Sequence, residues 1–434
     1  MPGAPTDPRR LALGLLANVL QRGQPFDEAL AGSRGVAGLE ARDRGFLRLL
    51  LATTLRRLGQ IDAAVDSLVQ RPLPRHPAEL RDLLRLGAAQ LLFLGTPPHA
   101  AVSTSLALAE TRKLRGFKGL INALLRRLAR EGEAILASQD AERLNLPPWL
   151  WDRLVAAYGE APTRASVAVQ LGEPPLDLSL KAGGEAAAWA ERLEAEILPT
   201  GSLRRPAAGG DVTALPGFAE GAWWVQDAAA ALPARLLGPV AGQRVADLCA
   251  APGGKTAQLA AAGAEVIAVE VSRARLARIA ENLKRLGLAA ALVEADATAW
   301  QPPEPLPFVL LDAPCSATGT LRRHPDVARL KSPKDLPALT ALQDRLLERA
   351  AAALAPGGTL VYATCSLLPE EGPERIARLL GEGAPLARRP VAPEEVGGLG
   401  ELITAEGDLR TLPCHLAARG GLDGFYACRL TKSG

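Results

Sequence analysis

Apolar residues recur every three or four positions through the first third of the chain. Between Pro8 and about Ser138 this spacing holds in the stretches LALGLLANVLQRG, ARDRGFLRLLLATTLRRLGQIDAAVDSLV, AELRDLLRLGAAQLLFL, AAVSTSLALAE and FKGLINALLRRLAR. Such spacing places the apolar side chains on one face of a helix. The pattern therefore predicts an all-α domain over residues 1–145.

Two adjacent prolines in NLPPWL interrupt the helical pattern at residues 145–150. Proline lacks the amide hydrogen that a helix interior needs, so we expect a domain boundary there. Residues 146–236 then mix helical stretches, such as GEAAAWAERLEAEIL, with short extended pieces, such as LDLSL. This mixture predicts a small α+β subdomain.

Apolar strands alternate with amphipathic helices from residue 237 to residue 434. The strand candidates are QRVADLCA, AEVIAVEVS, AALVEADAT, FVLLDAPC and TLVYATCS, and the helix candidates are KTAQLAAAG, RARLARIAENLKRLG and LTALQDRLLERAAAALAPGG. The alternation predicts a doubly wound, Rossmann-like α/β domain, whose ligands bind beyond the carboxyl ends of the strands. FYACRLT predicts a final strand at the edge of the sheet, antiparallel to the others.

Length and composition narrow the class of protein. The chain has 434 residues, more than a single core usually holds, and its 48% hydrophobic and 22% charged residues are typical of a soluble globular protein. No apolar run approaches the roughly 18 residues that span a bilayer, and no export signal is recognisable, so we expect a cytoplasmic protein. Five dispersed cysteines and scattered histidines predict free thiols and no metal site.

Positive charge is concentrated in the predicted helical domain. Residues 1–150 contain 21 basic and 14 acidic residues. This excess suits a nucleic-acid-binding module, although an Arg-rich solvated face would give the same count. The stretch from Arg112 to Arg130 has no acidic residue and suits a phosphate backbone. Our RNA-binding candidates are Arg112, Lys113, Arg115, Lys118 and Arg126, together with Arg322, Arg323 and His324 from the predicted α/β domain.

The segment DLCAAPGGKT, residues 247–256, ends the first predicted strand and opens a helix, where a doubly wound sheet holds a nucleotide-like ligand. A phosphate loop would need glycine at the position of Cys249, and the dinucleotide motif G-x-G-x-x-G is absent. Acidic residues end three successive strands, at Asp247, Glu270 and Asp296. They could merely cap helices, but the ordered set favours S-adenosylmethionine, which has a ribose and an amine but no phosphate, over NAD or ATP.

One cysteine follows each of the last two predicted parallel strands. Cys315 lies in DAPCSATGTLRRHPD and Cys365 in YATCS, so both should face one crevice. A single cysteine is usually a small buried hydrophobe, but a pair at consecutive strand ends indicates nucleophilic chemistry. Methylating C5 of cytosine requires a thiolate to add at C6 first, and Asp312 is placed to hydrogen-bond the pyrimidine edge. The residues alone leave open which cysteine attacks.

These segments together resemble the bacterial small-subunit ribosomal RNA cytosine-5 methyltransferases that carry a domain similar to the antitermination factor NusB. WVQDAAA, DLCAAPGGKT, DAPCSATGTLRRHPD and YATCS look like motifs of the catalytic part, and ARDRGFLRLL, IDAAVDSLV and INALLRRLAR look like the NusB-type module. The resemblance implies that Cys365 attacks and that Cys315 assists release, with Asp312 in support. It implies S-adenosylmethionine contacts from Cys249, Ala250, Ala251, Pro252, Gly253, Gly254, Lys255, Glu270, Arg275, Asp296 and Asp312.

The resemblance also implies the substrate, a cytosine in small-subunit ribosomal RNA that is free of protein or in an early assembly intermediate. We expect a monomer, because a fused RNA-binding module removes one reason to dimerise. One alternative is a transfer RNA cytosine-5 methyltransferase, against which the NusB-like module weighs. Another is a non-catalytic RNA-binding assembly factor, against which the intact Asp312, Cys315 and Cys365 argue.

Overall fold

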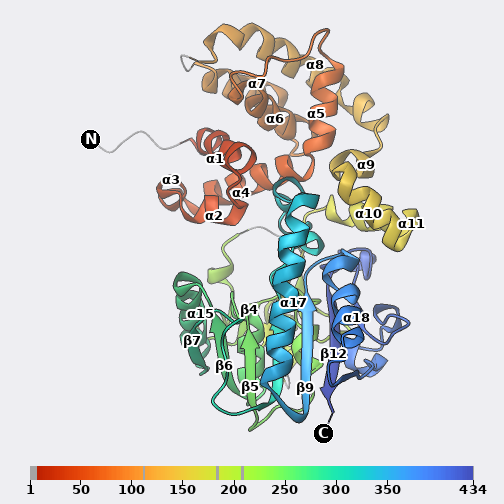
Figure 1. Ribbon diagram of the computed structural model, residues 1–434. Coiled ribbons are helices and arrows are strands. Elements are labelled where there is room, and N and C mark those ends of the chain that lie inside the picture. Colours follow the sequence, from red (N-terminus) through yellow and green to blue (C-terminus); the bar gives the residue numbers. More distant parts are fainter. Residues whose placement is uncertain (1–6, 111–112, 182–184, 207–209, 434) are drawn as a thin grey trace. The chain divides into compact units, whose positions relative to one another are not determined.

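The computed structural model describes residues 7–110, 113–181, 185–206 and 210–433, which form two compact units (Figure 1). The helical unit contains the residues up to Val155 and, from later in the chain, residues 210–211 and Arg323–Lys331. The sheet unit contains the other described residues. Among the described helices, none is long and apolar enough to cross a membrane.

The helical unit is all-α, as its spacing of apolar residues predicts. Leucine-rich faces form its core, for example Leu47, Leu50 and Leu51, which are fully buried. The first helix begins after Asp7, whose carboxylate accepts a hydrogen bond from the amide of Arg9 at 2.9 Å. The helices are α1 (Pro8–Arg22), α2 (Phe26–Ala31), α3 (Arg34–Ala37), α4 (Ala41–Arg56), α5 (Leu58–Ser67), α6 (Glu79–Leu92), α7 (Pro98–Leu108), α8 (Lys118–Ala137), α9 (Ala141–Asn145) and α10 (Pro148–Tyr158).

A short segment from the second half of the sequence packs within the helical unit. It contains α16 (Val327–Leu330) and comes directly after Arg322. The buried carboxylate of Asp326 accepts a hydrogen bond from the amide of Phe26 at 2.9 Å. Leu330 packs against the leucine core of the unit. The sequence pattern gives no sign of this placement, because the segment lies 170 residues or more beyond the helices that it contacts.

A small antiparallel sheet opens the sheet unit. Its strands are β1 (Leu176–Leu180), β2 (Glu196–Ile197), β3 (Leu203–Arg205) and β4 (Trp223–Val225), in the order β2-β3-β1-β4. Trp223 is fully buried beside Trp189 of α12 (Ala186–Arg192). Arg204 donates to both carboxylate oxygens of Asp177 at 2.6 and 2.7 Å, and both side chains are only 2% exposed.

The main sheet has the order β10-β12-β9-β8-β5-β6-β7, with β11 also paired to β12. The five strands expected from the sequence are parallel, which confirms the doubly wound domain. The strand containing FYACRLT is antiparallel as expected, but it is not at the edge, because β10 pairs with its outer side. The bounds are β5 (Arg244–Leu248), β6 (Glu265–Glu270), β7 (Ala291–Glu294), β8 (Leu306–Asp312), β9 (Leu354–Thr364), β10 (Leu386–Arg388), β11 (Leu409–Arg410) and β12 (Tyr426–Lys432).

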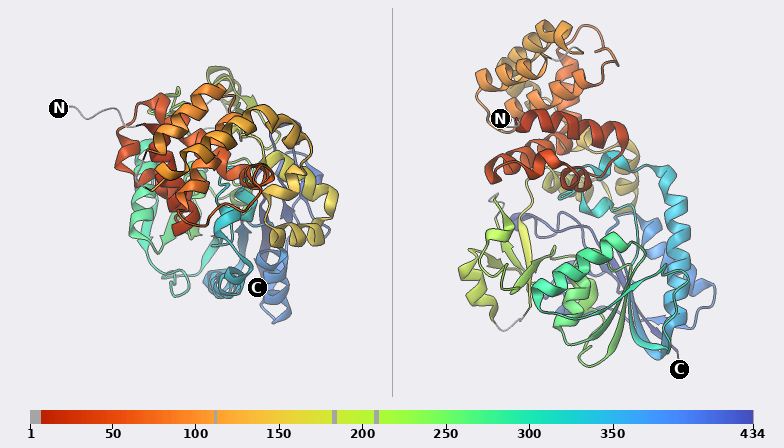
Figure 2. Two further views of the ribbon diagram at one scale, coloured as in Figure 1. Left: turned by 90° about the horizontal axis from the view of Figure 1, so that it is seen from above. Right: turned by 90° about the vertical axis from the view of Figure 1, so that its left-hand side faces the viewer.

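Helices cover both faces of the main sheet (Figures 1 and 2). Val361 packs into one core, whereas its neighbour Tyr362 packs into the other, because successive side chains of a strand point to opposite faces. One face carries α13 (Leu232–Arg235), α14 (Gly254–Ala261) and α15 (Arg273–Leu286). The opposite face carries α17 (Leu336–Ala353) and α18 (Pro373–Gly381). This arrangement leaves the carboxyl ends of the parallel strands to form a site.

We predict that Asp177→Ala lowers the free energy of unfolding of the sheet unit by about 3–5 kcal/mol, because it leaves the charge of Arg204 buried without its partner. The matched control is Glu304→Ala, which removes a pair with Arg244 whose two side chains are 41% and 71% exposed. That substitution should cost less than about 1 kcal/mol. Urea unfolding followed by circular dichroism measures both, and equal losses would contradict the prediction.

Candidate active site

Cys315 and Cys365 meet beyond the carboxyl ends of β8 and β9. The two strands are parallel, with Asp312 opposite Ala363. Backbone hydrogen bonds extend past that pair, since the amide of Ala313 donates to the carbonyl of Ala363 and that of Gly319 to the carbonyl of Cys365, each at 2.9 Å. The two Sγ atoms lie 3.4 Å apart, and both cysteines are partly exposed free thiols. The site thus presents two adjacent sulfur atoms at one strand end.

The surroundings of Cys315 favour its protonated form. The hydrogen bond with Cys365, burial, and the negative charge of Glu371 together raise the pKa of Cys315 well above its usual value. Cys315 is therefore a neutral thiol near pH 7, and its S–H can donate to the sulfur of Cys365. The pair is thus suited to one sulfur acting as a nucleophile and the other carrying a proton.

Asp312 is the last residue of β8 and lies in an ion pair with Lys255. The Lys255 ammonium donates to Asp312 Oδ2 at 2.6 Å, and the Lys255 side chain is only 9% exposed. The same ammonium lies 5.1 Å from the centre of the Phe425 ring. Lys255 therefore binds a carboxylate at the end of a strand and does not point to a phosphate site. This agrees with the sequence, which has Cys249 where a phosphate loop needs glycine. The pair offers both an acceptor and a proton donor.

Glu270 ends β6 and faces the loop that follows β5. Its carboxylate accepts from the amide of Ala251 at 3.3 Å and from that of Ser272 at 3.0 Å, and it pairs with Arg275 at 3.4 Å. Arg275 also donates to the carbonyl of Ala251 at 3.3 Å. The Glu270 side chain is 2% exposed. Each carboxylate oxygen has a further lone pair, so this group retains capacity to accept from ribose hydroxyls.

Asp247 is the buried acidic residue of β5. Its Oδ2 accepts from the hydroxyl of Thr256 at 2.5 Å, whereas Oδ1 has no hydrogen-bond partner among the residues that the structure describes. Burial raises the pKa of Asp247 to about 7. Burial also raises the pKa of the Cys249 thiol to about 12, so Cys249 stays neutral. A buried carboxylate oxygen without a donor is a natural acceptor for a ligand ammonium.

The remaining residues of the predicted cofactor loop shape its backbone. Gly253 has a φ of +98° at the start of α14, and a Cβ there would lie 3.1 Å from Ile279, so the fold itself requires this glycine. A Cβ on Gly254 would meet only Gln226, at an ordinary distance of 3.6 Å. Ala250 and Ala251 are buried, and the bond between Ala251 and Pro252 is cis. Asp296 lies two residues beyond β7 and accepts from the amide and hydroxyl of Thr298 at 2.8 Å each.

The predicted RNA-binding residues of the helical unit lie around α8. Arg112 lies outside the described residues. Lys113 pairs with Glu79 at 2.7 Å, Lys118 contacts Glu110, and Arg115 lies 3.8 Å from Glu110. Arg126 is exposed and donates to the side chain of Asn122 at 2.9 Å. Acidic residues from outside the basic stretch therefore offset part of its charge.

The three RNA-binding candidates that follow β8 fall into different units, Arg322 in the sheet unit and the other two in the helical unit. Arg322 is 1% exposed, contacts Asp227, lies 3.5 Å from Asp423 and donates to the carbonyl of Gly420 at 2.7 Å. Its guanidinium is therefore directed into the sheet unit and away from any phosphate. Arg323 and His324 belong to the helical unit and are half-buried, with His324 paired to Asp27 at 3.1 Å.

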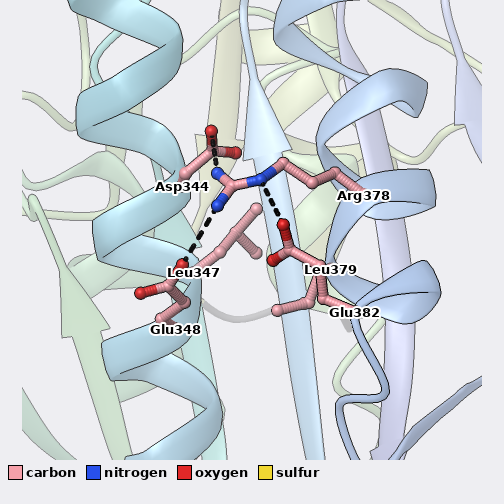
Figure 3. Close-up of a pocket in the computed structure, with 6 residues that line it drawn as sticks. All are labelled: Asp344, Leu347, Glu348, Arg378, Leu379 and Glu382. Carbon is pink, nitrogen blue, oxygen red and sulfur yellow. Dashed lines mark hydrogen bonds and ion pairs between the residues drawn. The ribbon is translucent and has the colours of Figure 1, made fainter.

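A hollow between α17 and α18 contains none of the predicted site residues (Figure 3). Its lining residues are Asp344, Leu347, Glu348, Arg378, Leu379 and Glu382. Arg378 crosses it, donating to Glu382 at 2.9 Å, lying 3.6 Å from Glu348 and contacting Asp344. The contacts with Asp344 and Glu348 join α18 to α17. Across the described ranges, no group of three or more His, Cys, Asp or Glu is arranged to hold a metal ion.

Sequence reasoning missed Glu371, which lies behind both cysteine loops. It ends the 3-10 helix η6 (Pro369–Glu371) and is fully buried. Its carboxylate accepts hydrogen bonds from Ser316 and Ser366, the residues directly after the two cysteines. The serine after each cysteine is visible in the sequence, but no sequence pattern marks Glu371 as the acceptor that both serines share.

Comparisons with known proteins agree with this geometry. A model of the family described as 16S rRNA methyltransferase RsmB/F matches residues 234–431, and a NusB family model matches residues 6–130. Ribosomal RNA small subunit methyltransferase B of Pseudomonas putida is 38% identical over 445 residues, covering 98% of each chain. The crystal structure of the protein PH0851 covers 99% of this chain and 100% of its own with a TM-score of 0.75 at 22% identity. The structure of a methyltransferase homolog from Pyrococcus horikoshii covers 67% of this chain and 96% of its own, with a TM-score of 0.55 at 24% identity.

The doubly wound sheet, the loop after β5 and the acidic end of β6 define the sheet unit as a methyltransferase domain. The chain belongs to the RsmB/F family of 16S rRNA methyltransferases, and its helical part matches the NusB family. The family expected from the motifs is thereby confirmed.

We predict that Cys365→Ala increases the rate at which iodoacetamide alkylates Cys315 near pH 8. The substitution removes the sulfur whose hydrogen bond and charge raise the pKa of Cys315, and each unit of pKa changes the thiolate fraction about tenfold. Peptide mass spectrometry measures the rate, with Cys414 in the same sample as the internal control. An unchanged ratio of the Cys315 rate to the Cys414 rate would contradict the assignment.

Proposed function

We propose that the protein transfers a methyl group from S-adenosylmethionine to C5 of a specific cytosine in small-subunit ribosomal RNA. Cys365 adds to C6 of the base, which makes C5 nucleophilic. After methyl transfer the proton on C5 is removed, the electron pair of the C5–H bond re-forms the C5–C6 double bond, and the Cys365 thiolate leaves. Cys315 assists this release by giving its thiol proton to the departing Cys365 sulfur, 3.4 Å away, while it takes up the proton from C5. The observation that carries the proposal is the 3.4 Å separation of the two sulfurs.

The assignment of Cys365 as nucleophile follows from the resemblance of its TCS segment to the family motif, since either sulfur can donate the hydrogen bond between them. Cys315 holds its proton at neutral pH because its pKa is raised by the contact with Cys365 and by burial. A protonated Cys315 can donate to a Cys365 thiolate but is itself a poor nucleophile. Asp312 and Lys255 form the second functional pair, 2.6 Å apart. Asp312 can hydrogen-bond the pyrimidine edge, and Lys255 is the adjacent source of a proton.

The residues around the loop after β5 fit the cofactor. Glu270 would hold the ribose hydroxyls, and the free oxygen of Asp247 would accept the ammonium, with Cys249 to Lys255, Arg275, Asp296 and Asp312 around them. S-adenosylmethionine supplies an electrophilic methyl group on a sulfonium. Neutral Cys249 packs in the loop and does not compete for that methyl group, since its thiol has a pKa of about 12.

Ribosomal RNA is favoured as substrate by the relatives, one of which is named for that activity at 38% identity. The exposed Lys113, Arg115 and Arg126 are proposed to contact its phosphates. A cytosine must be unstacked for a thiolate to reach C6 above the ring plane. A loop of protein-free RNA meets this requirement.

The test incubates the protein with labelled S-adenosylmethionine and either protein-free small-subunit ribosomal RNA or transfer RNA, and maps 5-methylcytosine. We expect one site in the ribosomal RNA for the wild type. Cys365→Ala should lose at least about 10³-fold in rate because the covalent route is closed. Cys414→Ala, outside the predicted site, is the matched control and should retain the wild-type rate.

If the protein methylates transfer RNA and not ribosomal RNA, then transfer RNA is the substrate and the ribosomal assignment is wrong. A wild-type protein that binds ribosomal RNA but methylates neither RNA would contradict the enzymatic proposal and favour an assembly factor. Cys365→Ala acting at the wild-type rate would exclude this cysteine as the nucleophile.

We also predict that cofactor binding releases protons through Asp247. Its pKa of about 7 leaves the carboxyl partly protonated at neutral pH, and a bound ammonium favours the charged form. Affinity should therefore increase as pH rises from 6 to 7, by up to about fivefold, the change in the ionised fraction over a range in which the ligand's own amine stays mostly protonated. Calorimetry in buffers of different ionisation enthalpy measures the number of protons released on binding. Asp247→Asn should remove the part of this release that comes from Asp247. Equal proton release by both proteins would contradict the assignment.

A further inference from the structure

A buried carboxylate joins the two cysteine loops from behind. The Glu371 Oε1 atom accepts from the amide of Ser316 at 2.8 Å and from Gln343 Nε2 at 3.1 Å. Its Oε2 atom accepts from the Ser366 hydroxyl at 2.6 Å and also contacts the Ser316 hydroxyl. Glu371, Ser366 and Gln343 are fully buried, and Ser316 is 1% exposed. One carboxylate therefore binds the residues that follow both cysteines.

The contacts continue into the backbone on each side of the cysteines. Gln343 of α17 also donates to the carbonyl of Pro314 at 2.9 Å, which fixes the residue before Cys315. The Ser366 and Ser316 hydroxyls lie 3.2 Å apart, and the hydroxyl of Thr318 accepts from the amide of Leu367 at 3.0 Å. The Glu371 backbone is itself held, because its carbonyl accepts from the hydroxyl of Tyr362 at 2.8 Å. The acceptor thus has a fixed position relative to β9.

We propose that Glu371 is a positioning residue that sets the separation and orientation of Cys315 and Cys365 by binding the two loops at once. For its effect on methyl transfer the inference rests on the proposed function, whereas its effect on sulfur spacing does not. A carboxylate suits this position because it has only acceptors, and the Ser316 amide and Gln343 Nε2 that contact it have only hydrogens to donate. An amide would turn an N–H group toward Ser316, Ser366 or Gln343. The loops would then be joined by the direct contacts alone, from Ser366 and Leu367 to Ser316 and Thr318 and from Gly319 to Cys365, and the spacing of the two sulfurs would change.

The first experiment measures sulfur spacing directly, without RNA or cofactor. Phenylarsine oxide condenses with two neighbouring thiols, forming two As–S bonds and releasing one water, and mass spectrometry identifies the bridged Cys315 and Cys365 peptides. We expect rapid bridging in the wild type and at least tenfold slower bridging in Glu371→Gln. Glu374→Gln is the matched control, since Glu374 lies three residues further along the chain and is 54% exposed. The two cysteines of this variant should be bridged as fast as those of the wild type.

The second experiment measures methyl transfer with the same three proteins. Misplacing a reacting group by about 1 Å costs about 10²-fold in rate, so kcat of Glu371→Gln should fall by about that factor. KM for RNA and the Kd of S-adenosylmethionine should stay within about twofold, because the cofactor loop after β5 makes no contact with Glu371. A general loss of structure would change all of these values together with the melting temperature.

Should Glu371→Gln fail to fold, Ser316→Ala and Ser366→Ala remove one donor each while keeping the carboxylate, and both should bridge more slowly than the wild type. Wild-type bridging in a folded Glu371→Gln, or in both serine variants if it does not fold, would overturn the inference. A loss of kcat with unchanged bridging would overturn it as well, because Glu371 would then act other than through sulfur spacing. A wild type that bridges but transfers no methyl group would instead refute the proposed function.

Discussion

The parallel pairing of β8 with β9 is the interaction on which the site depends. It sets Asp312 opposite Ala363, and the backbone bonds beyond that pair bring Cys315 and Cys365 to 3.4 Å. A shift of the pairing by one residue would turn side chains to the opposite face of the sheet. Tyr362 and Val361 oppose such a shift, because each is fully buried in a different core. The hydrophobic pattern of one strand thus specifies the chemistry at its end.

Charge within the sheet unit is arranged by pairing buried groups with complementary partners. Lys255 neutralises Asp312, Arg204 neutralises Asp177, and Glu371 receives only donors. Asp247 differs, since one of its oxygens is buried without a donor among the described residues and its pKa is raised to about 7. Unsatisfied buried polar atoms are uncommon and mark functional positions more often than satisfied ones. Among the described carboxylates of the sheet unit, Asp247 is the one with such an oxygen, and it lies where the cofactor is proposed to bind.

The sequence predicts the five parallel strands and the all-α module, because long periodic or apolar runs determine burial by themselves. It does not predict β10 and β11, which are only three and two residues long, or that β12 is covered on its outer side. Arg322 looks like a phosphate ligand in the sequence, yet it is buried between Asp227 and Asp423. Glu371 escapes notice for the same reason, since the partners of a buried charge come from distant segments that only the fold brings together.

The central claim, a covalent bond between Cys365 and C6 of the target cytosine, is tested most directly with ribosomal RNA containing 5-fluorocytidine and with S-adenosylmethionine present. Fluorine cannot leave C5 as a proton does, so release should stop after methyl transfer. We predict an RNA adduct that survives denaturation, carries the methyl group and maps by peptide mass spectrometry to Cys365. An adduct on Cys315, or methyl transfer that leaves no adduct on either cysteine, would contradict the account.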